Sequence, residues 1–505
     1  MTVPWLSIIV LSPFVAVVLL FVPSASRATT RVVALTSTLV SLVCALVVAQ
    51  RYDIAQGGYQ MREGGDLVSA LHIRYDLAVD GWGVALLLLT GLILFAGVFA
   101  SWTLEDRDKE FYILLLTLVG GVFGVFVSLD LFVFFLFYEI AVLPMYLLIG
   151  IWGSTKKVPA AGPFAAVLRR LDVGGREYAA MKLTLMLLVG SALILVSILA
   201  MYQQTGSFDM LTLGDAKLPR ALQLWAFPAL WLGFGTLAGV FPFHTWSPDG
   251  HASAPTAVSM LHAGVLMKLG AFGVMRVGMV LLPEGAQEWA WLVGAVAVIN
   301  VVYGALGAMS QTDLKYVVAY SSVSHMGIVM LGAATLTVNG WNGAIFQMFA
   351  HGLMTGLFFA LVGLIYHRAH DREIFRMGGF ASVMPGVAVF FTVAGLSSLG
   401  MPGLAGFVAE FLVFLGAWES GQWVWALAGI VGAWVTAVYV LRTVRAIFWG
   451  VGPPERYHDL HDAKGVEWVA LLTLGTALVL FGFWPRLVLD FIDGATTGYL
   501  ASVLG

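Results

Sequence analysis

Charged residues and cysteines are scarce in this sequence. Only 11% of its 505 residues are Asp, Glu, Lys or Arg, against roughly 25% in soluble domains. This shortage excludes a soluble globular class. The single cysteine, Cys44, rules out an internal disulfide and a cysteine-ligated cluster built from this chain alone. The net charge of −3 offers no basic surface for nucleic acid, so we expect no nucleic-acid partner.

Short cofactor motifs are also missing. The sequence contains no G-x-G-x-x-G run, no Walker loop and no C-x-x-C pair. His244, Asp249 and His251 cluster in HTWSPDGH, but they lack the i, i+4 spacing of H-E-x-x-H on a helix. We therefore expect no cofactor and no metal in this chain. The N-terminus lacks a basic segment and a cleavage site, which favours a retained first helix over a signal peptide.

What the sequence has in abundance is apolar residues, which make up 60% of the chain. Runs near the ~20 residues that cross a bilayer recur from one end to the other. Backbone in lipid must satisfy its own hydrogen bonds, so these runs predict helices. The fold class is thus all-α, a polytopic membrane protein with about 14 transmembrane helices, at 3–22, 31–50, 79–103, 111–128, 131–152, 181–203, 221–248, 255–281, 288–309, 313–336, 341–367, 381–418, 422–449 and 466–492.

The seventh and twelfth of these segments are too long for simple spans. Residues 221–248 contain FPFHTWSP and residues 381–418 contain GLSSLGMPGLAGF. Proline and glycine interrupt the helical ladder, which predicts discontinuous helices. Helices four to eight and helices nine to thirteen then form two sets of five. Because the first set crosses the membrane an odd number of times, the second set starts on the opposite side, and the two repeats are inverted. The expected division is an N-terminal three-helix segment, two five-helix repeats and a C-terminal helix, at 1–110, 111–281, 282–449 and 450–505.

The loops differ in basic residues. One alternating set of loops holds 18 of the 26 Lys and Arg residues, and the other holds seven, including Arg276. By the positive-inside rule the first set faces the cytoplasm, so both termini should face away from it. The turn with Asp249 and His251 then lies on the cytoplasmic side.

Five ionisable residues interrupt apolar segments near mid-depth: Glu139, Lys268, His325, His351 and Glu410. Such a group at the bilayer centre costs at least about 2.5 kcal/mol, so each needs a reason. One reading is buried polar residues that hold helices together. The other is a proton relay, because a carboxylate and a lysine shift each other's pKa and histidine titrates near physiological pH. Similar depth for all five favours the relay.

Four stretches carry a resemblance to a known family. FPFHTWSPDGHASAPTAVSMLHAGVLMKLGAFGVMR, SQTDLKYVVAYSSVSHMG, FQMFAHGLMTGLFF and GLAGFVAEF resemble the signatures of the antiporter-like membrane subunits of respiratory NADH–quinone oxidoreductase (complex I). The detail is most similar to the branch called subunit M or chain 4. The resemblance runs from about residue 80 to 450, in family order.

The resemblance implies an inner-membrane translocase subunit without a redox centre. It conducts protons while quinone is reduced elsewhere in the complex, with antiporter-like neighbours and lipid as partners. By motif, Glu139 matches the fifth-helix glutamate, Lys268 the eighth-helix lysine and Glu410 the ionisable residue of the broken twelfth helix. His325 and His351 match the histidines that link them. His244 and His262 are weaker candidates. His262 either lines the cytoplasmic entry for protons or has a packing role.

The chain departs from the family pattern in two places. Leu237 stands where the family usually has a seventh-helix lysine that pairs with the fifth-helix glutamate. Glu139 is then neutral, or pairs with Lys268 or His244, or this copy pumps differently or not at all. The insertion at 153–175 predicts a basic cytoplasmic loop that contacts anionic lipid or a neighbouring subunit.

Other functions share this core. A subunit of a multisubunit cation/proton antiporter, or of a membrane-bound hydrogenase or carbon-uptake complex, would carry the same signatures, as would a scaffold that has lost pumping. We expect no long lateral C-terminal helix, which favours the oxidoreductase.

Overall fold

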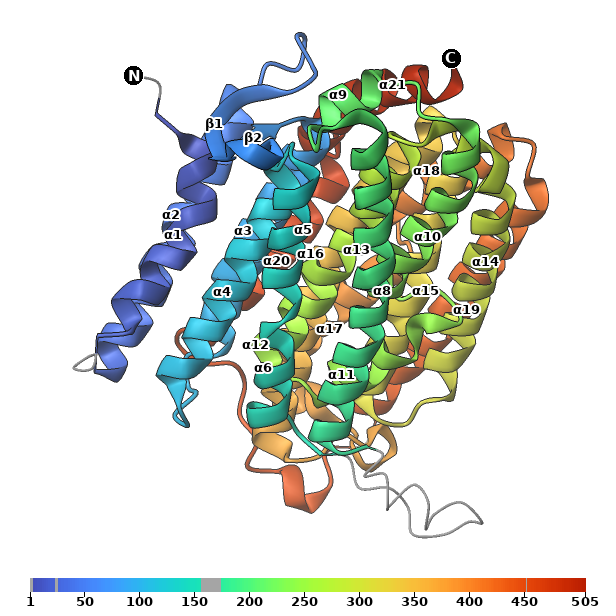
Figure 1. Ribbon diagram of the computed structural model, residues 1–505. Helices are drawn as coiled ribbons and strands as arrows, with labels where there is room; N and C mark the ends of the chain where they lie inside the picture. Colours follow the sequence, from blue (N-terminus) through green and yellow to red (C-terminus); the bar gives the residue numbers. More distant parts are fainter. Residues whose placement is uncertain (1–2, 23–25, 156–173, 451) are drawn as a thin grey trace.

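The structure is a helical bundle with both chain termini near the same end (Figure 1). The computed structural model describes residues 3–22, 26–155, 174–450 and 452–505. In those ranges, twelve helical segments are long and apolar enough to cross a membrane, and three shorter apolar helices accompany them. The prediction of an all-α polytopic membrane protein is confirmed. The predicted loop at 153–175 falls largely outside the described residues.

The first half of the chain contains the N-terminal helices, a hairpin and the first repeat. Its elements are α1 Trp5–Leu20, α2 Arg27–Arg51, β1 Gln60–Val68, β2 Ile73–Val79, α3 Gly81–Ala100, α4 Asp108–Val127, α5 Leu131–Val142, α6 Pro144–Trp152, α8 Arg176–Thr205, α9 Met210–Asp215, α10 Arg220–Ala238, α11 Trp246–Ser253, α12 Thr256–Leu261 and α13 Met267–Gly273. Two π-helical segments flank α13: η3 His262–Leu266 and η4 Val274–Met279.

The second half contains the second repeat and the C-terminal helices. Its elements are α14 Pro283–Ser310, α15 Leu314–Ala334, α16 Val338–Ala369, α17 Pro385–Ser398, α18 Ala405–Glu419, α19 Trp423–Phe448, α20 Glu467–Phe483 and α21 Arg486–Leu504. Aspartates start several helices. Asp130 accepts hydrogen bonds from the first N–H groups of α5, and Asp313 does the same for α15, which satisfies donors that have no partner within the helix.

Both predicted breaks are present. After α10 the chain turns at Gly239, whose φ of +79° favours glycine. Asn300 of α14 then accepts a hydrogen bond from the Phe241 N–H and donates one to the Gly239 carbonyl at 3.0 Å. In the second break, the Ser398 carbonyl at the end of α17 lies 3.0 Å from a ring nitrogen of His325. Neighbouring helices thus satisfy the backbone that the breaks expose.

The two broken helices run in opposite senses. In Figure 1, α10 and α11 lead from the end with the β-hairpin toward the opposite end, whereas α17 and α18 lead back toward the hairpin. This is the antiparallel relation expected of inverted repeats. We call the two ends of the bundle the hairpin end and the opposite end.

The C-terminal prediction is wrong in one respect. The segment at 466–492 is not one helix, because α20 ends at Phe483 and α21 begins after Pro485. Proline lacks the N–H that would continue the ladder. In Figure 1, α21 lies across the hairpin end of the bundle.

The antiparallel hairpin of β1 and β2 was not predicted. Arg62 of β1 pairs with Asp76 of β2 within the hairpin. The backbone N–H of Arg74 ties the hairpin to the bundle, because it donates to the Asp130 carboxylate at 2.9 Å. Because Asp130 also caps α5, the hairpin and the start of that helix share one anchor.

Candidate functional site

A buried lysine lies at the centre of the bundle. Lys268 of α13 has no exposed surface. Its Nζ lies 2.7 Å from Nδ1 of His351 on α16 and donates to the carbonyl oxygen of Ala263, one turn earlier on its own helix. With the lysine as the donor, the His351 nitrogen is the acceptor, so this contact joins two groups that can exchange a proton.

The contacts continue from His351 to a carboxylate. The rings of His351 and His325 stack with centroids 5.2 Å apart, and Nε2 of His325 lies 3.5 Å from Oε1 of Glu410. Both His325 nitrogens also face carbonyl oxygens, of Ser321 at 2.7 Å and of Ser398 at 3.0 Å. A neutral imidazole donates from one of its two nitrogens, and only an imidazolium donates from both.

Four of the five predicted residues therefore form one continuous series, which we call the central line: Lys268, His351, His325 and Glu410. Glu410 is 4% exposed and the other three are at most 2% exposed. The four come from α13, α16, α15 and α18, so the line passes from the first repeat into the second.

The structure does not bring Glu139 into this line. Within the described ranges Glu139 forms no ion pair, its Oε1 is buried without a hydrogen-bond partner, and Ser191 of α8 lies beside it. Leu237 is fully buried and supplies no cation. Of the substitute partners considered from the sequence, Lys268 contacts His351 instead, and His244 packs against aromatic rings.

The two weaker candidates differ in their surroundings. The His244 ring stacks on Phe241 at 5.7 Å and meets Tyr303 edge-on at 5.0 Å. His262 is 1% exposed and stacks on Trp246 with centroids 5.2 Å apart. Neither ring has a hydrogen-bond partner for its nitrogens among the described residues.

His251 and Lys315 are two residues that sequence reasoning missed. The turn predicted around His251 is wrong, since this residue belongs to α11 and has no exposed surface. Its ring centroid lies 4.0 Å from that of His262. Lys315, one of the 18 basic residues that the sequence count assigned to the cytoplasmic loops, is 4% exposed and donates to the Ala254 carbonyl at 2.7 Å. For both, the only signal in the sequence was position near a helix end, which indicates exposure rather than burial.

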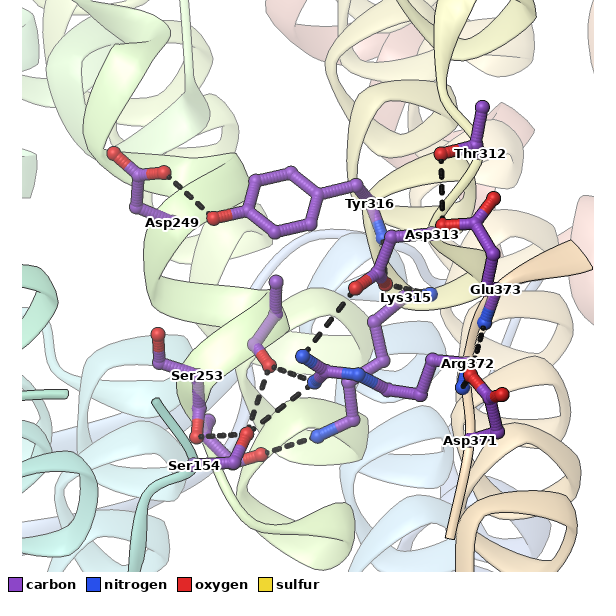
Figure 2. A network of polar contacts seen from close by, with 12 residues as sticks. Ser154, Asp249, Ser253, Thr312, Asp313, Lys315, Tyr316, Asp371, Arg372 and Glu373 are labelled. Carbon is purple, nitrogen blue, oxygen red and sulfur yellow. Dashed lines mark hydrogen bonds and ion pairs between the residues drawn. The ribbon is translucent and has the colours of Figure 1, made fainter. Parts of the chain in front are cut away.

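Polar contacts join the two repeats at the opposite end of the bundle (Figure 2). Arg372, in the segment after α16, pairs with Asp313 at 3.3 Å. The same guanidinium donates to the Ala252 carbonyl at 2.9 Å and to the Ser154 hydroxyl at 3.3 Å. One side chain therefore holds the end of α6, the end of α11 and the start of α15 together.

A second set of contacts centres on Asp249 of α11. Its carboxylate accepts a hydrogen bond from the Tyr316 hydroxyl at 3.0 Å, as Figure 2 shows. It also pairs with Lys182 of α8 at 2.8 Å. Asp249 was placed in a turn from the sequence, but it lies inside a short helix that is packed between α8 and α15.

The segment after α16 carries a carboxyl group with a perturbed pKa. Burial raises the pKa of Asp371, but hydrogen bonds from the backbone N–H groups of Glu373 and Arg372 outweigh it. The Tyr457 hydroxyl adds a third bond. The pKa therefore lies below its ordinary value, and the anion is favoured.

A second charged cluster lies near the hairpin end. Arg276, counted from the sequence as a loop residue, is 4% exposed in η4 and pairs with Asp80 at 2.6 Å. Its guanidinium also donates to the hydroxyls of Tyr59 and Tyr499. Four aromatic rings surround it, those of Tyr59, Trp82, Phe272 and Tyr499. These contacts fix the helix that carries Lys268 to α3 and α21.

The part of the chain that the structure describes holds no group of three or more His, Cys, Asp or Glu residues that could bind a metal ion. The side chains of the central line can donate and accept hydrogen bonds in turn.

Comparison with known proteins places the chain among membrane subunits of energy-converting complexes. A family model described as "NADH:quinone oxidoreductase/Mrp antiporter, TM" matches residues 172–436. NADH-quinone oxidoreductase subunit M of Rhodobacter capsulatus is 36% identical over 506 residues, covering 96% of this chain and 94% of that protein. NAD(P)H-quinone oxidoreductase chain 4 of a Synechococcus species is 36% identical over 513 residues, covering 99% of this chain and 93% of that protein.

A solved structure gives the same result. The structure of respiratory complex I from Thermus thermophilus with bound NADH contains a chain that is 27% identical and superposes with a TM-score of 0.87. The match covers 99% of this chain and all of the other.

Proposed function

The chain belongs to the family of membrane subunits shared by NADH:quinone oxidoreductases and Mrp antiporters, and we propose that it conducts protons as the M-type subunit of a bacterial NADH–quinone oxidoreductase. In this role quinone is reduced in a neighbouring part of the complex, and this chain contributes no redox centre. The relatives that support this assignment carry oxidoreductase names and align along almost their whole length.

The observation that carries the proposal is the central line. In the proposed step, the Lys268 ammonium transfers a proton to Nδ1 of His351 across the 2.7 Å contact. His351 then releases a proton toward His325, and His325 passes one to the Glu410 carboxylate, 3.5 Å away. Glu410 then releases its proton out of the second repeat, and each group is ready for the next proton, so the series is a relay and consumes nothing.

Glu139 has a different place in the proposal. Resemblance assigns it to proton translocation, but its carboxyl oxygen faces Ser191 rather than a cation. We propose that Glu139 influences how protons bind in the first repeat, although it does not lie on the central line. His244, stacked between Phe241 and Tyr303, is the weakest candidate of the set.

We also propose an orientation. The basic loops cluster at the end of the bundle opposite the hairpin, which the positive-inside rule assigns to the cytoplasm. Both termini then face away from the cytoplasm. Partners are the neighbouring membrane subunits and the lipid bilayer, since a bundle with so many exposed apolar side chains needs an apolar surround.

The alternative is a subunit of a cation/proton antiporter, because the matching family description covers Mrp proteins as well. A relay that ends on a carboxylate would serve either complex. The two differ in what drives it, namely quinone reduction or a cation gradient.

Lys268→Met and Glu410→Gln variants test the proposal in inverted membrane vesicles that contain the assembled complex. Vesicles receive NADH and a short-chain quinone, and proton uptake and NADH oxidation are measured together. Because proton-transfer groups contribute roughly 10²–10⁴-fold, we expect proton uptake per NADH to fall clearly in both variants. The exposed Lys464 supplies the control, and Lys464→Met should pump normally. If both buried variants pump as the wild type does, this chain does not conduct protons through the central line.

A further inference from the structure

A buried amide side chain lies where α10, α14 and α15 meet. Asn300 of α14 has no exposed surface, and α14 packs against both α10 and α15. Its Oδ1 accepts a hydrogen bond from the Phe241 N–H, and its Nδ2 donates to the carbonyl oxygens of Gly239 at 3.0 Å and Val323 at 3.1 Å. Among uncharged side chains, only an amide accepts one such bond and donates two at once.

Two of these bonds satisfy the backbone at the break after α10. Gly239 directly follows the last residue of that helix, and a helix end in an apolar surround has no water to pair its free carbonyl and N–H groups. Asn300 pairs one of each, the Gly239 carbonyl and the Phe241 N–H. The path of the chain through the break is therefore bound to this one side chain.

The third bond reaches the helix that carries His325 of the central line. Val323, which accepts this bond, lies two residues before His325 on α15. The backbones of α14 and α15 are in close contact here, because a Cβ added to Gly304 of α14 would lie only 2.5 Å from the Ser324 nitrogen. With no flexible side chains between the two helices, the place of Asn300 fixes the place of this part of α15.

The contacts of His325 leave little tolerance for a change in its position. Its Nε2 lies 3.0 Å from the Ser398 carbonyl at the second break and 3.5 Å from the Glu410 carboxylate. Proton transfer takes place over about 2.6–3.2 Å or through one water, so the contact with Glu410 is already long. A misplacement of reacting groups by about 1 Å can cost about 10²-fold in rate. The rate of the relay therefore depends on where α15 holds His325.

We infer that Asn300 is a positioning residue of the relay, which fixes His325 against the break after α10 and so keeps His325 within reach of Glu410. The inference rests on the proposed function and adds a residue to it that carries no proton. The amide of Asn300 does not titrate, so no step of the relay passes through it. Its effect on proton transfer goes entirely through the positions of α15 and the broken helix.

The chain offers a matched control on the same two helices. The Ser324 hydroxyl of α15 donates to the Val301 carbonyl of α14 at 2.8 Å, one position further along each helix than the bond from Asn300 to Val323. Ser324 is 1% exposed, so both bonds are buried. Its hydroxyl bonds α14 only, not the break after α10. Ser324→Ala therefore removes a bond between α14 and α15 without releasing the broken helix.

Asn300→Leu keeps the size of the side chain and removes all three hydrogen bonds. The variant is compared with Ser324→Ala in the same inverted vesicles, and proton uptake is expressed per assembled complex, which is quantified by native electrophoresis. We expect Asn300→Leu to lose about tenfold or more of this rate, and Ser324→Ala to stay near the wild type. A smaller amount of complex with unchanged uptake per complex would show a purely structural role and overturn the inference. Equal losses in the two variants would overturn it as well.

A conservative variant gives a second readout. Asn300→Gln and Asn300→Met introduce side chains of the same length, but only glutamine carries the amide that accepts one bond and donates two. We expect Asn300→Gln to retain several-fold more proton uptake per assembled complex than Asn300→Met. Equal uptake in this pair would mean that only the shape of the side chain matters, which contradicts the inference. The pair also decides the question if Asn300→Leu does not assemble.

The same vesicles separate this inference from the proposed function. Loss of uptake in Lys268→Met and Glu410→Gln together with normal uptake per complex in Asn300→Leu would retain the relay but refute the positioning role of Asn300. Normal uptake in Lys268→Met and Glu410→Gln would refute the proposed function itself.

Discussion

Replacing Asp80 by asparagine would leave the Arg276 guanidinium buried and without its counter-ion. The side chains of Arg276 and Asp80 are 4% and 1% exposed, and their closest atoms are 2.6 Å apart. Asparagine keeps the oxygen that accepts from the Gly83 N–H at 2.9 Å, so α3 retains its cap. The substitution removes the charge and also the second oxygen, which accepts a hydrogen bond from the Tyr499 hydroxyl at 2.9 Å.

The expected cost follows from what remains around Arg276. Removing one partner of a buried ion pair typically costs about 3–5 kcal/mol, because the other charge stays desolvated. Here the hydroxyls of Tyr59 and Tyr499 and ring faces at 4.9–5.4 Å still stabilise the cation. We therefore expect the lower end of the range, about 3 kcal/mol. With an unfolding entropy of roughly 2 cal/mol/K per residue, that lowers Tm by about 3 °C for a chain of this length.

The assay is heat-induced loss of this subunit from the purified complex, followed on native gels. Asp80→Asn, Arg276→Met and the double variant form a mutant cycle. Because the double variant contains neither charge, it should be more stable than Asp80→Asn. A double variant whose loss equals the sum of the single losses, or an Asp80→Asn protein that melts with the wild type, would refute the reasoning.

Three further predictions concern single positions. Leu237→Lys should cost about 2.5–3.5 kcal/mol in a Glu139→Gln background and less with Glu139 present, measured by Tm in both backgrounds; equal costs would exclude a pairing. Gly270→Ala should lower Tm because its added Cβ would lie 2.4 Å from the Phe234 carbonyl and overpacking costs about 1–3 kcal/mol; an unchanged Tm would contradict the close α10–α13 contact. The pKa of Asp371 lies below its ordinary value of 3.8, so its contribution is complete above that pH and is lost as pH falls below it. Proteolysis of this loop should rise on acidification in the wild type and change less in Asp371→Asn.

The sequence predicted which ionisable residues lie inside the bundle better than how they meet. Lys268, His325, His351 and Glu410 were identifiable because ionisable groups are costly inside apolar runs. Their order along the line was not, because it depends on which helices pack side by side. Lys268 and His351 are 83 positions apart and touch only because α12 and η3, which lead into α13, pack against α16.

The residues that were missed lie where burial contradicts the local sequence. His251 follows two helix-breaking residues, which indicates an exposed turn, yet α8 and α15 cover α11 from both sides. Arg276 stands near the end of an apolar run and was counted as a loop cation. Its burial requires Asp80 and Tyr499, which are distant in sequence. The hairpin was missed because its strands are short and polar between long apolar runs.

The contact between Lys268 and His351 also sets how many protons the line can hold. Two positive charges 2.7 Å apart would repel each other by about 6 kcal/mol even at an effective dielectric constant of 20. That disfavours double occupancy by roughly four orders of magnitude. The pair therefore holds one extra proton at a time, and a second cannot load until the first has left toward His325. In the proposed relay, protons therefore pass this point one at a time.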